Sequence, residues 1–225
     1  MKILALDTTT EYCSVALWQN GGVDTREAMA GQAHSQLLLP MVDDLLRQHA
    51  VFLKDLDGIA FGRGPGSFTG LRIACGVAQG LAFGAGVPVV GVSTLLALAE
   101  AVRSDHAVCC LDARMGEIYH AAYARSEEEW RAVHEASLCA PDAVPLLPEG
   151  AWTGCGSGFA AHGEALKRRY EGCLAEVRPE VYPHAREIAR LGVREFERGR
   201  GVPAEQALPV YIRDKVALRT DERTT

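Results

Sequence analysis

The chain has 225 residues, of which 48% are hydrophobic and 23% are charged, a composition ordinary for a globular protein with a real core. Its formal net charge of −6 argues against a protein that holds nucleic acid by itself, because phosphate binding needs a basic face. No apolar run approaches the length of a membrane span, and an aspartate at position 7 argues against a secretory signal.

The first hundred residues predict strands and helices in a regular order. Apolar and alternating segments indicate the strands, and Gly21-Gly22 supplies a hairpin turn between the second and third. The expected order is strand, strand, strand, helix, strand, helix, strand, helix, over residues 2–7, 13–19, 23–30, 34–50, 56–62, 70–86, 87–92 and 94–103.

Asp7-Thr8-Thr9-Thr10 follows the first predicted strand and permits two interpretations. The aspartate could hold a hydrated Mg²⁺ while the hydroxyls and backbone N–H groups meet a phosphate. Alternatively, the four residues form a β-turn in which Asp and Thr side chains cap local backbone groups. The turn is favoured, and nucleotide contact stays open.

The glycine-rich segment 62–70, GRGPGSFTG, looks like a phosphate loop but meets neither common fingerprint. A P-loop needs Lys followed by Ser or Thr after its last glycine, and G-x-G-x-x-G fails because Thr69 takes the final position. Ser67 or Thr69 is a natural N-cap for the next helix. Gly64, Gly66 and Ser67 therefore remain candidates for vestigial nucleotide contact, with a turn and a helix cap preferred.

Two neighbouring helices of this half predict contact with another chain. Gly76, Gly80 and Gly84 lie four residues apart on one helix side, and each costs about 1 kcal/mol relative to alanine. Close approach of another backbone would compensate that cost. The preceding helix has an apolar arc of roughly 200°, about twice what one core needs. The predicted partner surface comprises His34, Leu37, Leu38, Met41, Leu45, Ala74, Gly76, Val77, Gly80 and Gly84; the alternative is that both helices are simply well buried.

A similar pattern begins again near Ser104. Residues 108–124 resemble residues 3–18, and Leu111-Asp112 echoes Leu6-Asp7. Further elements are expected as a strand at 131–138, a helix at 141–147, the segment AWTGCG at 151–156, a helix at 159–170, a strand at 174–178 and a helix at 184–198. We therefore expect two α/β lobes, residues 1–103 and a smaller 104–225 with a returning tail.

The remaining residues offer no evident catalytic set. Seven cysteines without a C-x-x-C pair indicate reduced thiols in the cytoplasm. No two histidines have i, i+4 spacing, so no metal site is expected. His162 and Glu164 are candidates only because they adjoin the glycine-rich segment 153–162; a solvated helix surface is the simpler interpretation.

The doubled βββαβαβα order, with an aspartate closing the first strand of each lobe, resembles the actin, sugar-kinase and Hsp70 group, whose lobes are ribonuclease H-like. In that group ATP lies in the cleft between the lobes, and the hairpin after the first strand approaches its phosphates. A stand-alone kinase or ATPase is therefore one functional hypothesis.

Six segments resemble the TsaB (YeaZ) family more closely: LDTTTEYCSVAL, HSQLLLPMVDDLL, GRGPGSFTGLRIACGVAQGLA, GVSTLLALA, LDARMGEIY and PVYIRDKVA. The resemblance runs in order from residue 2 to about 217, and GPGSFTGLR and DARMGE are its most specific segments. The resemblance implies a non-catalytic subunit of the complex that transfers a threonylcarbamoyl group to the N6 of the adenosine next to the anticodon in ANN-decoding tRNAs.

The resemblance also implies partners. The chain would pair with the catalytic relative TsaD through the first-lobe helices, be joined there by the ATPase TsaE, meet tRNA only through the complex, and form homodimers alone. Thr94 and Leu98 stand where the two metal-binding histidines of TsaD would be. No cofactor is then required by this chain, ATP is used by the complex, and weak ATP or ADP binding stays open. The family's old "glycoprotease" label suggests a peptidase as a third, less supported reading.

Overall fold

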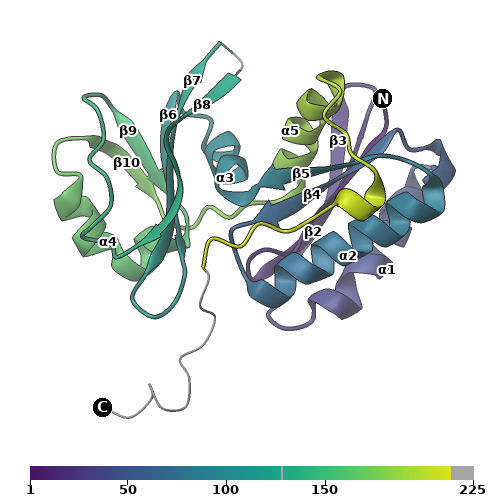
Figure 1. Ribbon diagram of the computed structural model, residues 1–225, viewed down its shortest axis with the longest axis horizontal. Helices are drawn as coiled ribbons and strands as arrows, with labels where there is room; N and C mark the ends of the chain where they lie inside the picture. The colour runs from purple at the N-terminus through teal and green to yellow at the C-terminus, as the bar shows by residue number, and fades with distance from the viewer. Residues whose placement is uncertain (128, 214–225) are drawn as a thin grey trace.

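The computed structural model describes residues 1–127 and 129–213 and has two lobes, each built on a five-stranded sheet (Figure 1). The first sheet has the order β3-β2-β1-β4-β5 and the second β8-β7-β6-β9-β10. The strands of the first are β1 (Ile3–Asp7), β2 (Tyr12–Gln19), β3 (Gly22–Met29), β4 (Gly58–Gly64) and β5 (Val89–Ser93). Those of the second are β6 (His106–Asp112), β7 (Ile118–Ser126), β8 (Glu129–Cys139), β9 (Trp152–Cys155) and β10 (Leu174–Arg178).

The two sheets repeat one topology. In the first, β1 pairs antiparallel with β2 and parallel with β4, which pairs parallel with β5. In the second, β6, β7, β9 and β10 pair in the same senses. Asp7 and Asp112 end the equivalent strands β1 and β6. The predicted pair of α/β lobes is therefore confirmed.

Within residues 1–127 and 129–213, five α-helices connect and cover the sheets: α1 (His34–Gln48), α2 (Phe68–Ala85), α3 (Thr94–Val102), α4 (Ser157–Arg169) and α5 (Ala185–Glu197). Two short 3₁₀ turns lie at Leu53–Asp55 and Ala204–Gln206. Within the described ranges, none of these helices has the length and apolar character needed to cross a bilayer.

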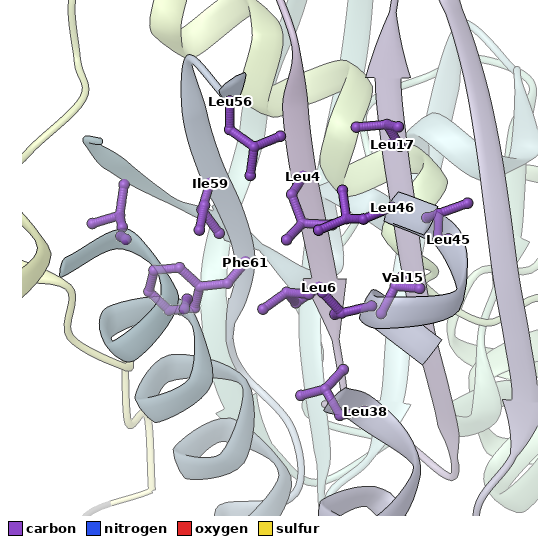
Figure 2. Packing of buried hydrophobic residues seen from close by; sticks show 14 of the residues in the cluster. Leu4, Leu6, Val15, Leu17, Leu38, Leu45, Leu46, Leu56, Ile59 and Phe61 are labelled. Atoms are coloured by element: carbon purple, nitrogen blue, oxygen red, sulfur yellow. The ribbon is translucent and has the colours of Figure 1, made fainter. Parts of the chain in front are cut away.

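The central strands β1 and β4 of the first sheet are buried on both faces, whereas the antiparallel edge strand β3 is exposed or half-buried along its length. Helices α1 and α2 cover one face, where the apolar side chains of β1, β2 and β4 meet those of α1 (Figure 2). The labelled residues there are Leu4, Leu6, Val15, Leu17, Leu38, Leu45, Leu46, Leu56, Ile59 and Phe61. Alternate residues Ile3 and Ala5 face the other way, onto Ile188 and Ala189 of α5.

Helix α5 packs on the first sheet although it follows the second lobe in sequence (Figure 1). The backbone N–H of Ala185 donates to Ser14 Oγ on β2 at 2.8 Å, which fixes the start of the helix. A Cβ at Gly192 would lie 2.6 Å from Ala60 Cβ, so glycine lets α5 approach β4 closely. A division of the chain at Ser104 therefore assigns α5 to the second lobe, although this helix packs on the sheet of the first lobe.

The expected helix over 141–147 was wrong. Residues 140–151 link β8 to β9 without a helix. Pro145 inside the stretch removes a backbone donor and would clash with the preceding turn. Val144 and Leu147 are instead buried against the second sheet from an irregular backbone.

Ile188→Ala tests the docking of α5. Ile188 has no exposed surface and contacts the core of the first sheet, so the cavity should lower the free energy of unfolding by about 2–4 kcal/mol. The matched control is Leu146→Ala, because Leu146 is 62% exposed; its effect should stay within about 0.5 kcal/mol. Urea titration followed by circular dichroism measures both. Equal effects of the two substitutions would contradict this packing.

Candidate functional site

A cleft of about 720 Å³ separates the two lobes. The first lobe contributes the turn after β1 and the loop between β4 and α2, and the second lobe contributes the turn after β6. These segments lie at the carboxyl ends of strands, where α/β folds hold ligands. Residues on its walls include Thr9, Thr10, Gly66, Ser67, His34, Asp112, Arg114, Ser157, Tyr211 and Arg213.

Asp7 does not reach this cleft. Its side chain has no exposed surface, and the Thr9 hydroxyl donates to its Oδ2 at 3.1 Å. Its Oδ1 has no partner among residues 1–127 and 129–213, and a Cβ at Gly62 would overlap that oxygen. Burial raises the pKa of Asp7 to about 7. The interpretation of Asp7 as a nucleotide or Mg²⁺ contact is therefore corrected, because its carboxylate is enclosed by the turn and β4.

The glycine loop packs on the Thr8–Thr9 turn. Thr8 Oγ1 donates to the carbonyl of Gly70 at 2.6 Å, and the N–H of Ser67 donates to the carbonyl of Thr9 at 2.8 Å. A Cβ at Gly66 would overlap the carbonyl of Thr9, and a Cβ at Gly70 would overlap the carbonyl of Thr8. The space left by these glycines is thus occupied by the chain's own backbone.

The loop also starts helix α2 as expected. Ser67 is the N-cap, and its Oγ accepts a hydrogen bond from the N–H of Gly70 at 3.3 Å. Gly64 lies away from the cleft walls, and its Cβ position is 2.7 Å from the carbonyl of Val210. Of the predicted residues, Thr9, Thr10, Gly66 and Ser67 line the cleft, while Asp7, Thr8 and Gly64 do not. Nucleotide contact by the four that do stays a prediction.

Sequence reasoning missed the charged side chains on the second-lobe wall. Arg114 lies 2.9 Å from Asp112 and 3.5 Å from Glu11 of the first lobe, so it links the lobes. Arg213 donates to the carbonyl of Ala113 at 3.0 Å and pairs with Glu117 at 2.8 Å. The segment DARMGE was the available signal, since it carries Asp112, Arg114 and Glu117 in six residues.

The two weaker candidates of the second lobe, His162 and Glu164, both lie on α4. His162 Nε2 is 3.8 Å from Asp112 Oδ1, and Glu164 is exposed on α4. Neither is on the cleft walls. Within the described ranges, no three His, Cys, Asp or Glu side chains group closely enough to hold a metal ion.

Helix α2 has two different small-residue faces. Ala74, Ala78 and Ala82 are buried against the first sheet. Gly76, Gly80 and Gly84 are exposed, and no atom of the described chain lies within 4 Å of their Cβ positions beyond the helix itself. Phe83 beside them is 81% exposed. We call Gly76, Gly80, Gly84 and Phe83 the glycine face.

Four residues of the predicted partner surface belong to the interior instead. Leu38, Leu45 and Ala74 have no exposed surface. His34 is buried, with Nε2 2.9 Å from the carbonyl of Thr10. The centre of the wide apolar arc of α1 packs into the protein's own core, so only the margins of the arc are left for a partner. Leu37 and Met41 of α1 and Val77 of α2 are half-buried, and they stay candidates with the three glycines.

The sequence matches, over residues 14–217, the family described as "TsaD: tRNA N6-adenosine threonylcarbamoyltransferase". The "tRNA threonylcarbamoyladenosine biosynthesis protein TsaB" of Escherichia coli K12 is 40% identical over 97% of each chain. The protein of that name from Haemophilus influenzae is 34% identical over 97% of this chain and 96% of its own. The solved structure "YeaZ from Pseudomonas aeruginosa" has a TM-score of 0.87 and 40% identity, covering 93% of this chain and 99% of that one.

Gly70→Ala and Gly76→Ala should act in opposite directions although both lie in α2. At position 70 the methyl group meets the Thr8 carbonyl, so backbone shifts should destabilise the protein by about 1–3 kcal/mol. At position 76 it meets open space, so the better helix propensity should stabilise by up to about 1 kcal/mol. Urea unfolding of both variants checks this. If both substitutions stabilise the protein, or both destabilise it, the packing of the glycine loop on the Thr8–Thr9 turn is contradicted.

The Asp7 carboxyl should make stability depend on pH. Its native pKa of about 7 exceeds the ordinary 3.8, so the native state binds the proton more tightly than the unfolded chain does. Relative to Asp7→Asn, the parent should therefore lose stability as the pH rises from 4 to 8, by up to about 4 kcal/mol. Burial also raises the pKa of Glu187, but both proteins contain it. Parallel stability curves for the two proteins would refute a buried, protonated Asp7.

Proposed function

This chain belongs to the TsaB (YeaZ) family of tRNA threonylcarbamoyladenosine biosynthesis proteins, and we propose that it is the subunit that binds and activates the catalytic subunit TsaD. TsaD then transfers the threonylcarbamoyl group to the N6 of the adenosine next to the anticodon in ANN-decoding tRNAs. The chain itself performs no step of that transfer and acts in the cytoplasm.

The observation that carries the proposal is the glycine face of α2. Three glycines inside one helix together cost about 3 kcal/mol relative to alanine, and no contact within the described chain requires them. A second helix crossing there could approach the backbone of α2 closely and bury Phe83 as well. Such contact would compensate the cost, and TsaD is the partner that the family membership points to.

Thr94 and Leu98 support a non-catalytic role. By the family resemblance they stand where TsaD carries its two metal-binding histidines. Both are fully buried, Thr94 at the start of α3 and Leu98 in its middle. A hydroxyl and an aliphatic side chain enclosed in this way supply no imidazole ligand for a divalent ion. In this proposal the metal chemistry belongs to TsaD.

The remaining partners follow the same proposal. TsaE joins at the contact between this chain and TsaD and uses ATP, so no cofactor is required by this chain. In the absence of TsaD, two copies of the chain meet through the glycine face. A stand-alone kinase or ATPase has less support, because the enclosed carboxylate of Asp7 would have to move before it could face a nucleotide.

Reconstitution tests the function. Purified TsaD and TsaE, the threonylcarbamoyl donor, ATP and an ANN-decoding tRNA should yield the modified nucleoside only when this chain is added. Mass spectrometry of the digested tRNA measures the product. Equal yield without the chain would refute the proposal.

Gly80→Leu tests the contact. The added side chain stands where the second helix would pack, so affinity for TsaD should fall at least tenfold, as measured by light scattering after size exclusion. The matched control is Gly163→Leu in α4, where a Cβ also meets no described atom within 4 Å; it should pair normally. If both variants pair like the parent protein, the glycine face is not the contact.

A further inference from the structure

A second, more open hollow of about 520 Å³ lies where α3, α5, β2 and β7 meet. Figure 1 shows α3 and α5, which supply most of its lining residues, in the region between the two sheets. Its ionisable residues are Arg103, Arg125, Arg190, Arg194, Glu100 and Glu197. Its walls therefore have an excess of positive charge, although the whole chain has a net charge of −6.

Two of these arginines are partly neutralised. Arg194 lies 3.6 Å from Glu100, and Arg190 lies 3.7 Å from Glu187. Glu100 is buried and also accepts a hydrogen bond from Trp130 Nε1 at 2.8 Å. Its carboxylate is thus shared between two partners and is held in place.

The other two guanidinium groups have no such compensation. Arg103 is exposed at the C-cap of α3, and Arg125 lies over the Trp130 ring, 5.6 Å from its centroid. Neither has a carboxylate within 4 Å in the part of the chain that the structure describes. Positive groups gathered around one hollow repel one another, so an anion placed between them would be stabilised.

The geometry favours a phosphate as that anion. A guanidinium group presents parallel N–H donors that match two phosphate oxygens. Trp18 also lines the hollow and is only partly buried, so its indole offers a flat surface for a base beside the phosphate. We propose that this hollow binds the phosphodiester backbone of the tRNA modified by the complex, an inference that rests on the proposed function.

The position of the hollow leaves the glycine face free. Helix α2 covers one face of the first sheet and α5 covers the other. A tRNA held between α3 and α5 would therefore not compete with a protein docked on α2. The two contacts can be disrupted separately.

The test is a double charge reversal, Arg103→Glu with Arg125→Glu. Fluorescence anisotropy measures tRNA affinity of the chain paired with TsaD, and of the chain alone, between about 50 and 200 mM salt. The variant should bind at least tenfold more weakly than the parent protein, with the salt slope reduced by about two. The matched control is Lys167→Glu with Arg168→Glu, a charge reversal at two exposed residues of α4. The tRNA affinity of this control should stay within about twofold of that of the parent protein.

Two results would overturn the proposal: unchanged tRNA affinity in the hollow variant, with or without a loss of ATP binding, or an equal loss of tRNA affinity in the α4 control. Titration calorimetry with ATP and with pyrophosphate measures the loss of ATP binding and identifies a free-nucleotide site. Should the charge reversal unfold the protein, Arg103→Gln with Arg125→Gln replaces it, with a loss of at least fivefold expected. Pairing of the parent protein with TsaD is measured separately. If the parent protein does not pair with TsaD, the proposed function is wrong; if it pairs but the hollow variant keeps its tRNA affinity, only the inference about the hollow is wrong.

Discussion

The contact between the Thr8–Thr9 turn and the glycine loop determines how the first lobe is built. Two hydrogen bonds join the segments, and Gly66 and Gly70 permit an approach that any side chain would block. This contact fixes where α2 begins and how it is rotated about its axis. The rotation buries Ala74, Ala78 and Ala82 and turns the three glycines outward. A loop that looks like a phosphate cradle thus has a structural role that reaches the far end of α2.

Much of the fold could be predicted from local patterns. The strands of both lobes alternate or form short apolar runs, and Leu6-Asp7 with Leu111-Asp112 marked equivalent positions that the structure confirms. The prediction of a helix at 141–147 was wrong, because Pro145 inside that stretch disfavours a continuous helix. The actin-like fold is also supported by the high structural similarity to YeaZ.

The sites were harder to predict, because burial depends on tertiary packing. A helical stripe shows which residues share a face, but not which part of a wide stripe enters the core, so Leu38 and Leu45 were assigned to the surface. For Asp7 the sequence favoured a turn but left contact with a ligand open, and its burial depends on packing that the sequence does not show. Arg103, Arg125, Arg190 and Arg194 come from three elements far apart in sequence, and no spacing rule brings them together.

The return of α5 to the first sheet makes the first lobe discontinuous along the chain. Much of one face of that sheet stays uncovered until residues 185–197 have been synthesised, and those residues come after nearly all of the second lobe. On a ribosome, with elongation at about 5–20 residues per second, Ile3, Ala5 and Ala60 would therefore remain uncovered for several seconds after β1 and β4 have formed. The second lobe resembles an insertion that must be made before the first can close, so the two halves of this protein complete their folding together.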